Sequence, residues 1–251
     1  MEYTDIDQVS AADGLRLVLV RGFPSPWGQA AKAMMEFKGL EFMAGAQQAG
    51  GKNPELVAWA GTNSGPVVAW NDEAPLNRWD DILMLLERLA PDKPLIPEDP
   101  AARAESLGLA QLICGQLGFG WNIRLVGTHD AVQAGKPVGY LGEKYGYNET
   151  DGPLALERVL RLMNHLASLL DGQTSRGSAY LLGDSVTAPD FYWAAFSNLV
   201  QIQSAEECPL DAQIRTRFER QHPVLAEALP PSLIEHRDHI MRNFFKIPME
   251  L

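Results

Sequence analysis

Over the first ~90 residues the hydrophobic positions alternate between the spacing of a strand and that of a helix. The apolar run LRLVLVRG, from residue 15, is typical of a buried strand, and PWGQAAKAMMEFKG after it has helical spacing. LEFMAGA then predicts a strand, NPELVAWAG a helix, GPVVAW a strand, and EAPLN a partner strand across a turn at Asn71 and Asp72. NRWDDILMLLERLA predicts an amphipathic helix that Asn77 caps. The predicted order is β-α-β-α-β-β-α, which is a small mixed sheet with helices.

The rest of the chain has a different pattern. Four prolines fall within ten residues (Pro91, Pro94, Pro97 and Pro100), and this predicts a linker at 93–100 between a domain at 1–92 and a domain at 101–251. Strand signals then fade, and helical patterns cover 100–127, with a break near Gly118 and Gly120, then 152–172, 187–203, 209–229 and 231–246. We therefore expect the second domain to be an all-helical bundle of about five helices.

Composition narrows the class of protein. The 251 residues carry a net charge of -11, and this argues against a nucleic-acid partner, which would need a basic face. No apolar run approaches the ~20 residues of a membrane span, and the acidic start lacks the apolar centre of a secretory signal. Cys114 and Cys208 lie far apart, and neither is in a CxxC motif, so redox-dithiol and zinc-ribbon functions are excluded. We expect a reduced cytoplasmic protein without a bound metal.

The stretch YLLGDSVTAPDFYWAA, from Tyr180, has the spacing of a helix cap. Thr187 can accept a hydrogen bond from the backbone N–H of Asp190, and the Asp190 carboxylate can accept one from the Thr187 N–H. Pro189 falls in the first turn of the helix, where proline is tolerated. This motif predicts a stabilising cap and no chemistry.

Three features together resemble the glutathione transferase superfamily. They are the β-α-β-α-β-β-α unit with Gly65 and Pro66 before its third strand, the proline-rich linker, and the cap stretch, which is similar to the family's hLhGdxhTxADhxh pattern. The resemblance extends from about residue 15 to about residue 225. It implies an α/β plus all-α protein, with a thioredoxin-like domain followed by an all-helical domain. It also implies glutathione as co-substrate, a small electrophile as second substrate, and a homodimer.

Ser25, in SPWG, is the catalytic candidate. The resemblance places there the residue that hydrogen-bonds the glutathione sulfur, and a hydroxyl at a helix N-terminus can stabilise a thiolate. The alternative is that Ser25 only caps the helix. The resemblance further implies that Pro66 is cis and that the Gly65 backbone pairs with the cysteinyl part of glutathione. The alternative for these two residues is a plain turn before a strand.

The chain departs from the family where the γ-glutamyl group would bind. The family pattern [E/Q]-S-x-x-I-x-x-Y-L places a Glu or Gln and a Ser at the start of the third helix, and the equivalent residues here are Arg78 and Trp79. Arg78 can clamp a carboxylate but cannot hold an α-amino group, because both are cations. Trp79 either fills part of the glutathione site or turns into the core. Glutathione is therefore expected to bind in an altered way or not at all.

The second-substrate pocket is expected beside Ser25. The candidates for its lining are Trp27, Cys114, Phe119, Trp121 and Tyr140, although apolar residues on helices are more often part of a core. His236 and His239 have helical i,i+3 spacing, but without further ligands nearby they are expected on a solvated helix face.

Three functions remain open from the sequence. The first is a glutathione transferase in which Ser25 stabilises the thiolate. The second is a binding or structural protein that keeps the fold but has lost ordinary glutathione binding, which Arg78 and Trp79 favour. The third is a glutathione-dependent lyase or isomerase, because the choice of electrophile depends on the helical pocket.

Overall fold

The computed structural model describes residues 1–251 as three strands and twelve helices. The strands are β1 (Leu15–Val20), β2 (Met43–Gln47) and β3 (Val67–Trp70). The helices are α1 (Ile6–Ala11), α2 (Pro26–Lys38), α3 (Pro54–Ala60), α4 (Trp79–Leu89), α5 (Pro100–Cys114), α6 (Phe119–Gln133), α7 (Tyr140–Lys144), α8 (Gly152–Thr174), α9 (Ala188–Ser197), α10 (Ala212–Glu219), α11 (Pro223–Ala228) and α12 (Pro231–Phe244).

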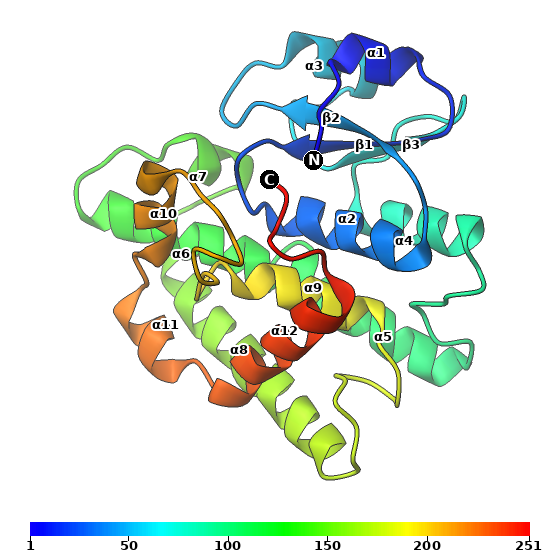
Figure 1. Ribbon diagram of the computed structural model, residues 1–251. Helices are drawn as coiled ribbons and strands as arrows, with labels where there is room; N and C mark the ends of the chain where they lie inside the picture. The colour runs from blue at the N-terminus through cyan, green and yellow to red at the C-terminus, as the bar shows by residue number, and fades with distance from the viewer.

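The first part of the chain forms a layered α/β unit around the mixed sheet that the sequence predicts. The strand order is β2-β1-β3, with β1 parallel to β2 and antiparallel to β3. Helices α1 and α3 lie on one face of the sheet, and α2 and α4 lie on the other, toward the helical part (Figure 1). Side chains of β1 alternate accordingly, because Leu17 and Leu19 belong to the main core and Val18 to a small cluster with α1 and α3.

Two local predictions in this unit need correction, and one short helix was not predicted. The strand expected at EAPLN is reduced to one bridge between Leu76 and Val68, because Pro75 has no N–H to donate and the helix begins soon after. The cap position of α4 is Arg78 rather than Asn77, and neither side chain caps the helix. The short helix α1 was not expected, since its six residues bury only Val9 and give little periodicity.

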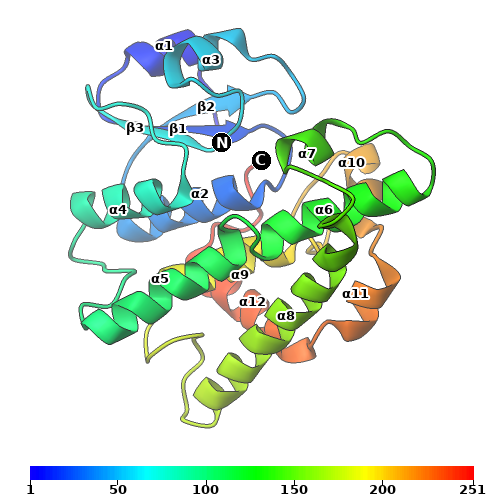
Figure 2. The same ribbon diagram turned by 180° about the vertical axis from the view of Figure 1, so that it is seen from behind.

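The second part is all-helical, as predicted, but has eight helices instead of about five. The break expected near Gly118 and Gly120 lies at residues 115–118, where Leu117 adopts a left-handed φ of 60°. The pattern at 209–229 is divided into α10 and α11, because Pro223 starts a new helix. Helix α9 is the centre of the protein: all its residues are buried, and it contacts α2, α5 and α12 (Figure 2).

The cap of α9 is completely enclosed. The Asp190 carboxylate accepts hydrogen bonds from the Leu181 N–H (2.8 Å), the Thr187 N–H (2.8 Å) and the Thr187 hydroxyl (2.9 Å). His236 of α12 lies against the same carboxylate, with Nε2 3.1 Å from Oδ1 and both side chains buried. The expectation of a solvated His236 is wrong, because i,i+3 spacing does not tell which side of α12 faces the core. His239 is half-buried.

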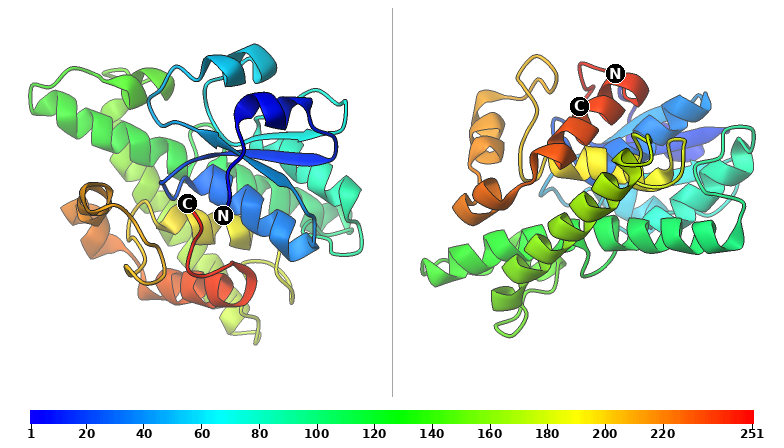
Figure 3. Two further views of the ribbon diagram at one scale, coloured as in Figure 1. Left: turned by 45° about the horizontal axis from the view of Figure 1, so that its top comes forward. Right: turned by 90° about the horizontal axis from the view of Figure 1, so that it is seen from below.

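The two ends of the chain lie side by side (Figure 3). The Glu250 carboxylate lies 3.4 Å from the N-terminal amine, 3.4 Å from Lys32 Nζ on α2, and 2.7 Å from Lys246 Nζ. The C-terminal segment is therefore tied to α2 through Lys32. None of the helices combines the length and the apolar character that crossing a membrane requires.

Candidate functional site

A cavity of about 910 Å³ lies where the two parts of the chain meet. The starts of α2 and α4 and the loop before β3 form one wall, and α5, α6, α7 and α10 contribute the other. All nine predicted site residues line it: Ser25, Trp27, Gly65, Pro66, Arg78, Trp79, Cys114, Trp121 and Tyr140. Phe119, the remaining candidate, does not, because it is fully buried against Trp193 with ring centroids 5.2 Å apart.

Ser25 stands at the N-terminal cap position of α2, but its side chain does not cap the helix. Its backbone is extended, its carbonyl accepts the first helical bond from the Gln29 N–H at 2.9 Å, and its hydroxyl makes no cap hydrogen bond. Pro26 follows as the first helical residue, so the nearest free backbone donors are the N–H groups of Trp27 and Gly28. The start of α2 thus offers a half-buried hydroxyl and the positive end of a 13-residue helix to the cavity.

Gly65 and Pro66 bring backbone to the same wall. The peptide bond between them is cis, as the sequence resemblance implies. A Cβ at Gly65 would lie 3.1 Å from the Val18 carbonyl oxygen, so this position fits a residue without a side chain. The loop before β3 can therefore lie directly against β1, and the backbone of Gly65 is left facing the cavity beside Ser64.

Arg78 and Trp79 occupy the start of α4. Arg78 is largely exposed and pairs with Asp80 at 2.7 Å and with Asp81 at 3.5 Å, and the hydrogen bond to Asp80 raises its pKa. The Trp79 ring packs edge-on against Tyr192 of α9, with centroids 5.7 Å apart, and is only partly buried. Trp79 thus packs against the core on one side and lines the cavity on the other.

Trp27 connects the two parts of the chain across the base of the cavity. Its indole N–H donates to the Cys114 carbonyl oxygen at 2.8 Å. Its ring packs edge-on against Phe196 at 4.7 Å and stacks on Tyr145 at 6.0 Å. These contacts fix the first turn of α2, and Ser25 with it, against the helical part without any contribution from a side-chain cap.

Comparison with solved structures identifies the architecture. A glutathione S-transferase from Methylobacterium radiotolerans, in complex with glutathione sulfonate, matches over 92% of each chain with a TM-score of 0.63 and 19% identity. One from Methylobacillus flagellatus with glutathione bound matches over 95% of this chain and 100% of its own, with a TM-score of 0.66 and 14% identity. The nitrogen regulation fragment of the yeast prion protein Ure2p matches over 92% and 93%, with a TM-score of 0.63 and 14% identity.

This chain has the glutathione transferase fold. The fold class expected from the sequence is therefore confirmed: a thioredoxin-like unit followed by an all-helical one. No protein-family model and no curated protein sequence matches the chain, so the likeness is one of structure.

Within the glutathione transferase fold, the predicted residues on the helical wall of the cavity differ in how far they are exposed to it. Cys114 is buried, donates its thiol to the Ala110 carbonyl at 3.0 Å, and has a pKa raised well above the usual value by burial, so it is an unreactive thiol. Trp121 donates its indole N–H to the Tyr145 carbonyl at 2.9 Å and presents part of its ring. Tyr140 is exposed at the mouth of the cavity.

Several lining residues were not found from the sequence. They are mainly cations and aromatic residues of α6, α7 and α10, namely Arg124, Lys144, Tyr145, Arg217, Phe218 and Arg220. The sequence around Arg217 and Arg220 predicts only a polar helix. Arg124 lies in a helix without a clear apolar face. Their common location depends on how the helices pack, and no motif carries that information. No cluster of His, Cys, Asp or Glu side chains suited to a metal ion is present.

Proposed function

We propose that this protein is a glutathione-dependent transferase in which Ser25 stabilises the thiolate for attack on a small electrophile. The observation that carries the proposal is the Ser25 hydroxyl, which stands at the N-terminus of α2, lines the cavity and makes no cap hydrogen bond. A hydroxyl that caps its own helix would be engaged, whereas this one is available to a ligand. The glutathione complexes among the structural relatives support glutathione as the thiol.

Different lining residues would contact different parts of glutathione. The Ser25 hydroxyl and the first N–H groups of α2 would hold the sulfur, and the Gly65 backbone would pair with the cysteinyl unit. Glutathione supplies the nucleophilic sulfur. A hydrogen bond to the thiolate and the positive end of the helix both favour the charged form, so the thiol pKa falls and more thiolate is present at neutral pH. The glutathione thiolate can then form its bond to the electrophile without first losing a proton.

At the start of α4, glutathione would have to bind differently from the pattern of the glutathione transferase family. The Arg78 guanidinium is already paired with Asp80, and the Trp79 ring occupies a place where a small hydroxyl would leave room. These two residues favour a second candidate function, a binding protein of the same fold that no longer takes glutathione in the ordinary way. One structural relative, the nitrogen regulation fragment of the yeast prion protein Ure2p, is described by a regulatory role.

Titration with glutathione separates the two candidates. Trp27 and Trp79 both line the cavity, so tryptophan emission should change as glutathione binds. Absence of any change up to several millimolar glutathione, together with no retention on a glutathione resin, would contradict the enzyme proposal. In that event, Trp79→Ser would be expected to restore binding if the indole is the obstacle.

Replacement of the hydroxyl tests the catalytic role. With glutathione and 1-chloro-2,4-dinitrobenzene, Ser25→Ala should lower kcat/KM by about 30- to 100-fold, the equivalent of one hydrogen bond to a charged group. The glutathione Kd should stay nearly constant, and the pH profile of kcat/KM should shift upward because the thiol pKa rises. Ser175→Ala, an exposed serine outside the cavity, is the matched control. Unchanged activity and pH profile in Ser25→Ala would refute the role of Ser25.

The proposal also includes a homodimer acting in the cytoplasm, both by resemblance to the family. The molar mass in solution, from light scattering, tests the dimer against the 27.6 kDa of one chain.

A further inference from the structure

The charges around the cavity are opposite to those of the protein as a whole. Asp and Glu outnumber Lys and Arg by 32 to 21 along the chain. The cavity is nevertheless lined by no Asp or Glu and by five cations: Arg78, Arg124, Lys144, Arg217 and Arg220. In a protein with this excess of carboxylates, a wall that gathers only positive side chains indicates an anionic ligand.

Four of these cations have no carboxylate partner. Arg78 is paired with Asp80 and Asp81, but no carboxylate lies within 4.0 Å of Arg124, Lys144, Arg217 or Arg220. Of these four, Arg124 is half-buried, whereas Lys144, Arg217 and Arg220 are exposed. An unpaired cation that is partly removed from water, as Arg124 is, is costly, and the cost is offset when an anion binds.

Arg124 and Lys144 both line the helical wall of the cavity. The Arg124 Nε atom is buried and has no hydrogen-bond partner. Lys144 donates to the Ser64 hydroxyl at 2.6 Å, next to Gly65, and therefore spans the cavity from α7 to the loop before β3. Lys144 is exposed, but the nearby protein desolvates its ammonium group, and this, followed by the charge of Arg124, lowers its pKa. The two cations repel each other, and an anion between them would relieve that repulsion.

Flat aromatic surfaces lie directly beside this pair. The Lys144 ammonium is 5.6 Å from the centre of the Tyr145 ring and 5.9 Å from that of Tyr140. Tyr145 in turn stacks on Trp27 and meets Trp121 edge-on, with centroids 4.9 Å apart. A ligand that extends from Ser25 to these cations can therefore stack on aromatic rings.

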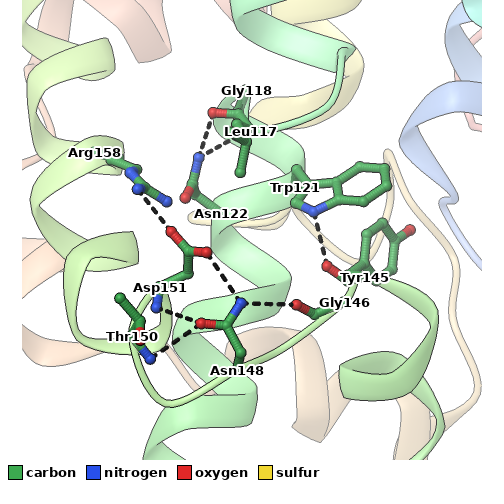
Figure 4. Close-up of polar contacts among 10 residues, drawn as sticks. All are labelled: Leu117, Gly118, Trp121, Asn122, Tyr145, Gly146, Asn148, Thr150, Asp151 and Arg158. Atoms are coloured by element: carbon green, nitrogen blue, oxygen red, sulfur yellow. Dashed lines mark hydrogen bonds and ion pairs between the residues drawn. The ribbon is translucent and has the colours of Figure 1, made fainter.

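The wall that carries these residues is held in place (Figure 4). Trp121 of α6 binds the Tyr145 carbonyl, directly after α7. Asn148 then donates to the Asp151 carboxylate at 3.0 Å, and Arg158 of α8 donates to the same carboxylate at 2.8 Å. The segment after α7 is thus anchored to α8, so Lys144 and Tyr145 are presented at a defined position.

We propose that the second ligand of this cavity is an aromatic organic anion, whose carboxylate, sulfonate or phosphate group is held by Arg124 and Lys144 while its ring lies among Trp27, Trp121 and Tyr145. This names the substrate class of the proposed transferase and in that respect rests on the proposed function. The binding of the anion itself does not depend on glutathione.

A matched pair of fluorescent probes tests the charge requirement. 8-Anilinonaphthalene-1-sulfonate carries a sulfonate, and N-phenyl-1-naphthylamine has the same rings without it. Titrations without glutathione should give a Kd for the sulfonate that rises about 10-fold in Arg124→Gln and in Lys144→Gln, the loss expected for one charge-assisted hydrogen bond. The Kd for the neutral probe should change less than about twofold. Arg161→Gln, an exposed cation of α8 outside the cavity, should leave both values unchanged.

The outcomes separate this inference from the proposed function. Equal effects on both probes, or none on either, would overturn it, since the cations would then not recognise the charge. Glutathione titrated against the same variants should keep its Kd. If glutathione weakens instead and the sulfonate does not, the cations serve glutathione and the inference fails while the transferase proposal stands. If the wild-type protein binds no glutathione but the sulfonate depends on Arg124 and Lys144, the proposed function fails and the anion site stands.

Discussion

Helices α2 and α9 begin with the same local pattern and use it in different ways. Each has a hydroxyl residue at the cap position, Ser25 in α2 and Thr187 in α9, and a proline in the first turn. At α9 the Thr187 hydroxyl and N–H both bind the Asp190 carboxylate, and all these groups are buried. At α2 the Ser25 hydroxyl makes no cap bond and lines a cavity.

The difference follows from what surrounds each helix. All residues of α9 are buried, so each polar group must find a partner in the protein or lose the free energy of its hydration. The start of α2 borders a cavity, where solvent or a ligand can satisfy the hydroxyl. Other contacts hold α2 in place. The Trp27 indole N–H donates to the Cys114 carbonyl, and Lys32 pairs with Glu250. A capping pattern therefore stabilises the fold where it is enclosed, and where it is open it leaves a group free for chemistry.

The largest effect is expected from removing the enclosed carboxylate. Asp190→Ala leaves the Leu181 and Thr187 N–H groups without acceptors and His236 without its neighbour, so the free energy of unfolding should fall by about 3–5 kcal/mol. Urea unfolding monitored by circular dichroism measures it. Asp184→Ala, an exposed carboxylate in the same loop, should change it by less than about 0.5 kcal/mol. Should Asp190→Ala not fold, Asp190→Asn gives a smaller loss of the same sign. A loss below about 1 kcal/mol would contradict the enclosed-cap interpretation.

The sequence predicts the enclosed cap better than the open one. Thr187, Pro189 and Asp190 form a motif whose spacing predicts a capping box, and the Asp190 carboxylate accepts from the Thr187 N–H as expected. The core face of β1 and the mixed sheet also follow from periodicity. Local patterns of this kind carry their own geometry, which is why the fold class could be inferred.

The cavity depends on contacts that are distant along the chain. Nine candidate residues were named because the resemblance to a family placed them, and they do gather around one cavity. The cations of the helical wall were missed, since Arg124 and Lys144 reach the cavity, and Lys144 reaches Ser64, only through the packing of α6 and α7. Whether Ser25 caps its helix was equally open, because the side-chain rotamer is decided by neighbours that the local sequence does not reveal.

A smaller effect on stability is expected from the Glu250 carboxylate, which pairs with Lys32 of α2. The hydrogen bond from Lys246, then the charges of Lys32 and the N-terminal amine, lower the pKa of Glu250 from 4.5 to about 2. A carboxyl whose pKa is lower in the folded state stabilises it above the unfolded pKa, and that contribution is lost as the pH falls from about 4.5 toward 2. We expect about 1 kcal/mol at pH 7, because solvent screens a partly exposed carboxylate.

The pH dependence of two variants checks the role of Glu250. Glu250→Gln should unfold more easily than the wild type at pH 7, and the difference should shrink steadily as the pH is lowered below about 4.5. Glu235→Gln, an exposed residue of α12 without an ion pair, should follow the wild type at every pH. A constant difference between Glu250→Gln and the wild type down to pH 2 would mean that packing, and not charge, holds the C-terminal segment on α2.

The smallest effect on stability is expected at Ser25, and it is the most decisive for the comparison. Loss of a working cap costs about 1 kcal/mol, so Thr187→Val should lose about that much or more because its bond is buried. Ser25→Ala removes no cap hydrogen bond, and its free energy of unfolding should stay within about 0.5 kcal/mol of the wild type. Urea unfolding of both variants under identical conditions measures the contrast. A loss of about 1 kcal/mol or more in Ser25→Ala would mean that the hydroxyl does cap α2 in solution. The two helix starts would then be equivalent, and a fall in turnover could no longer be assigned to a thiolate contact alone.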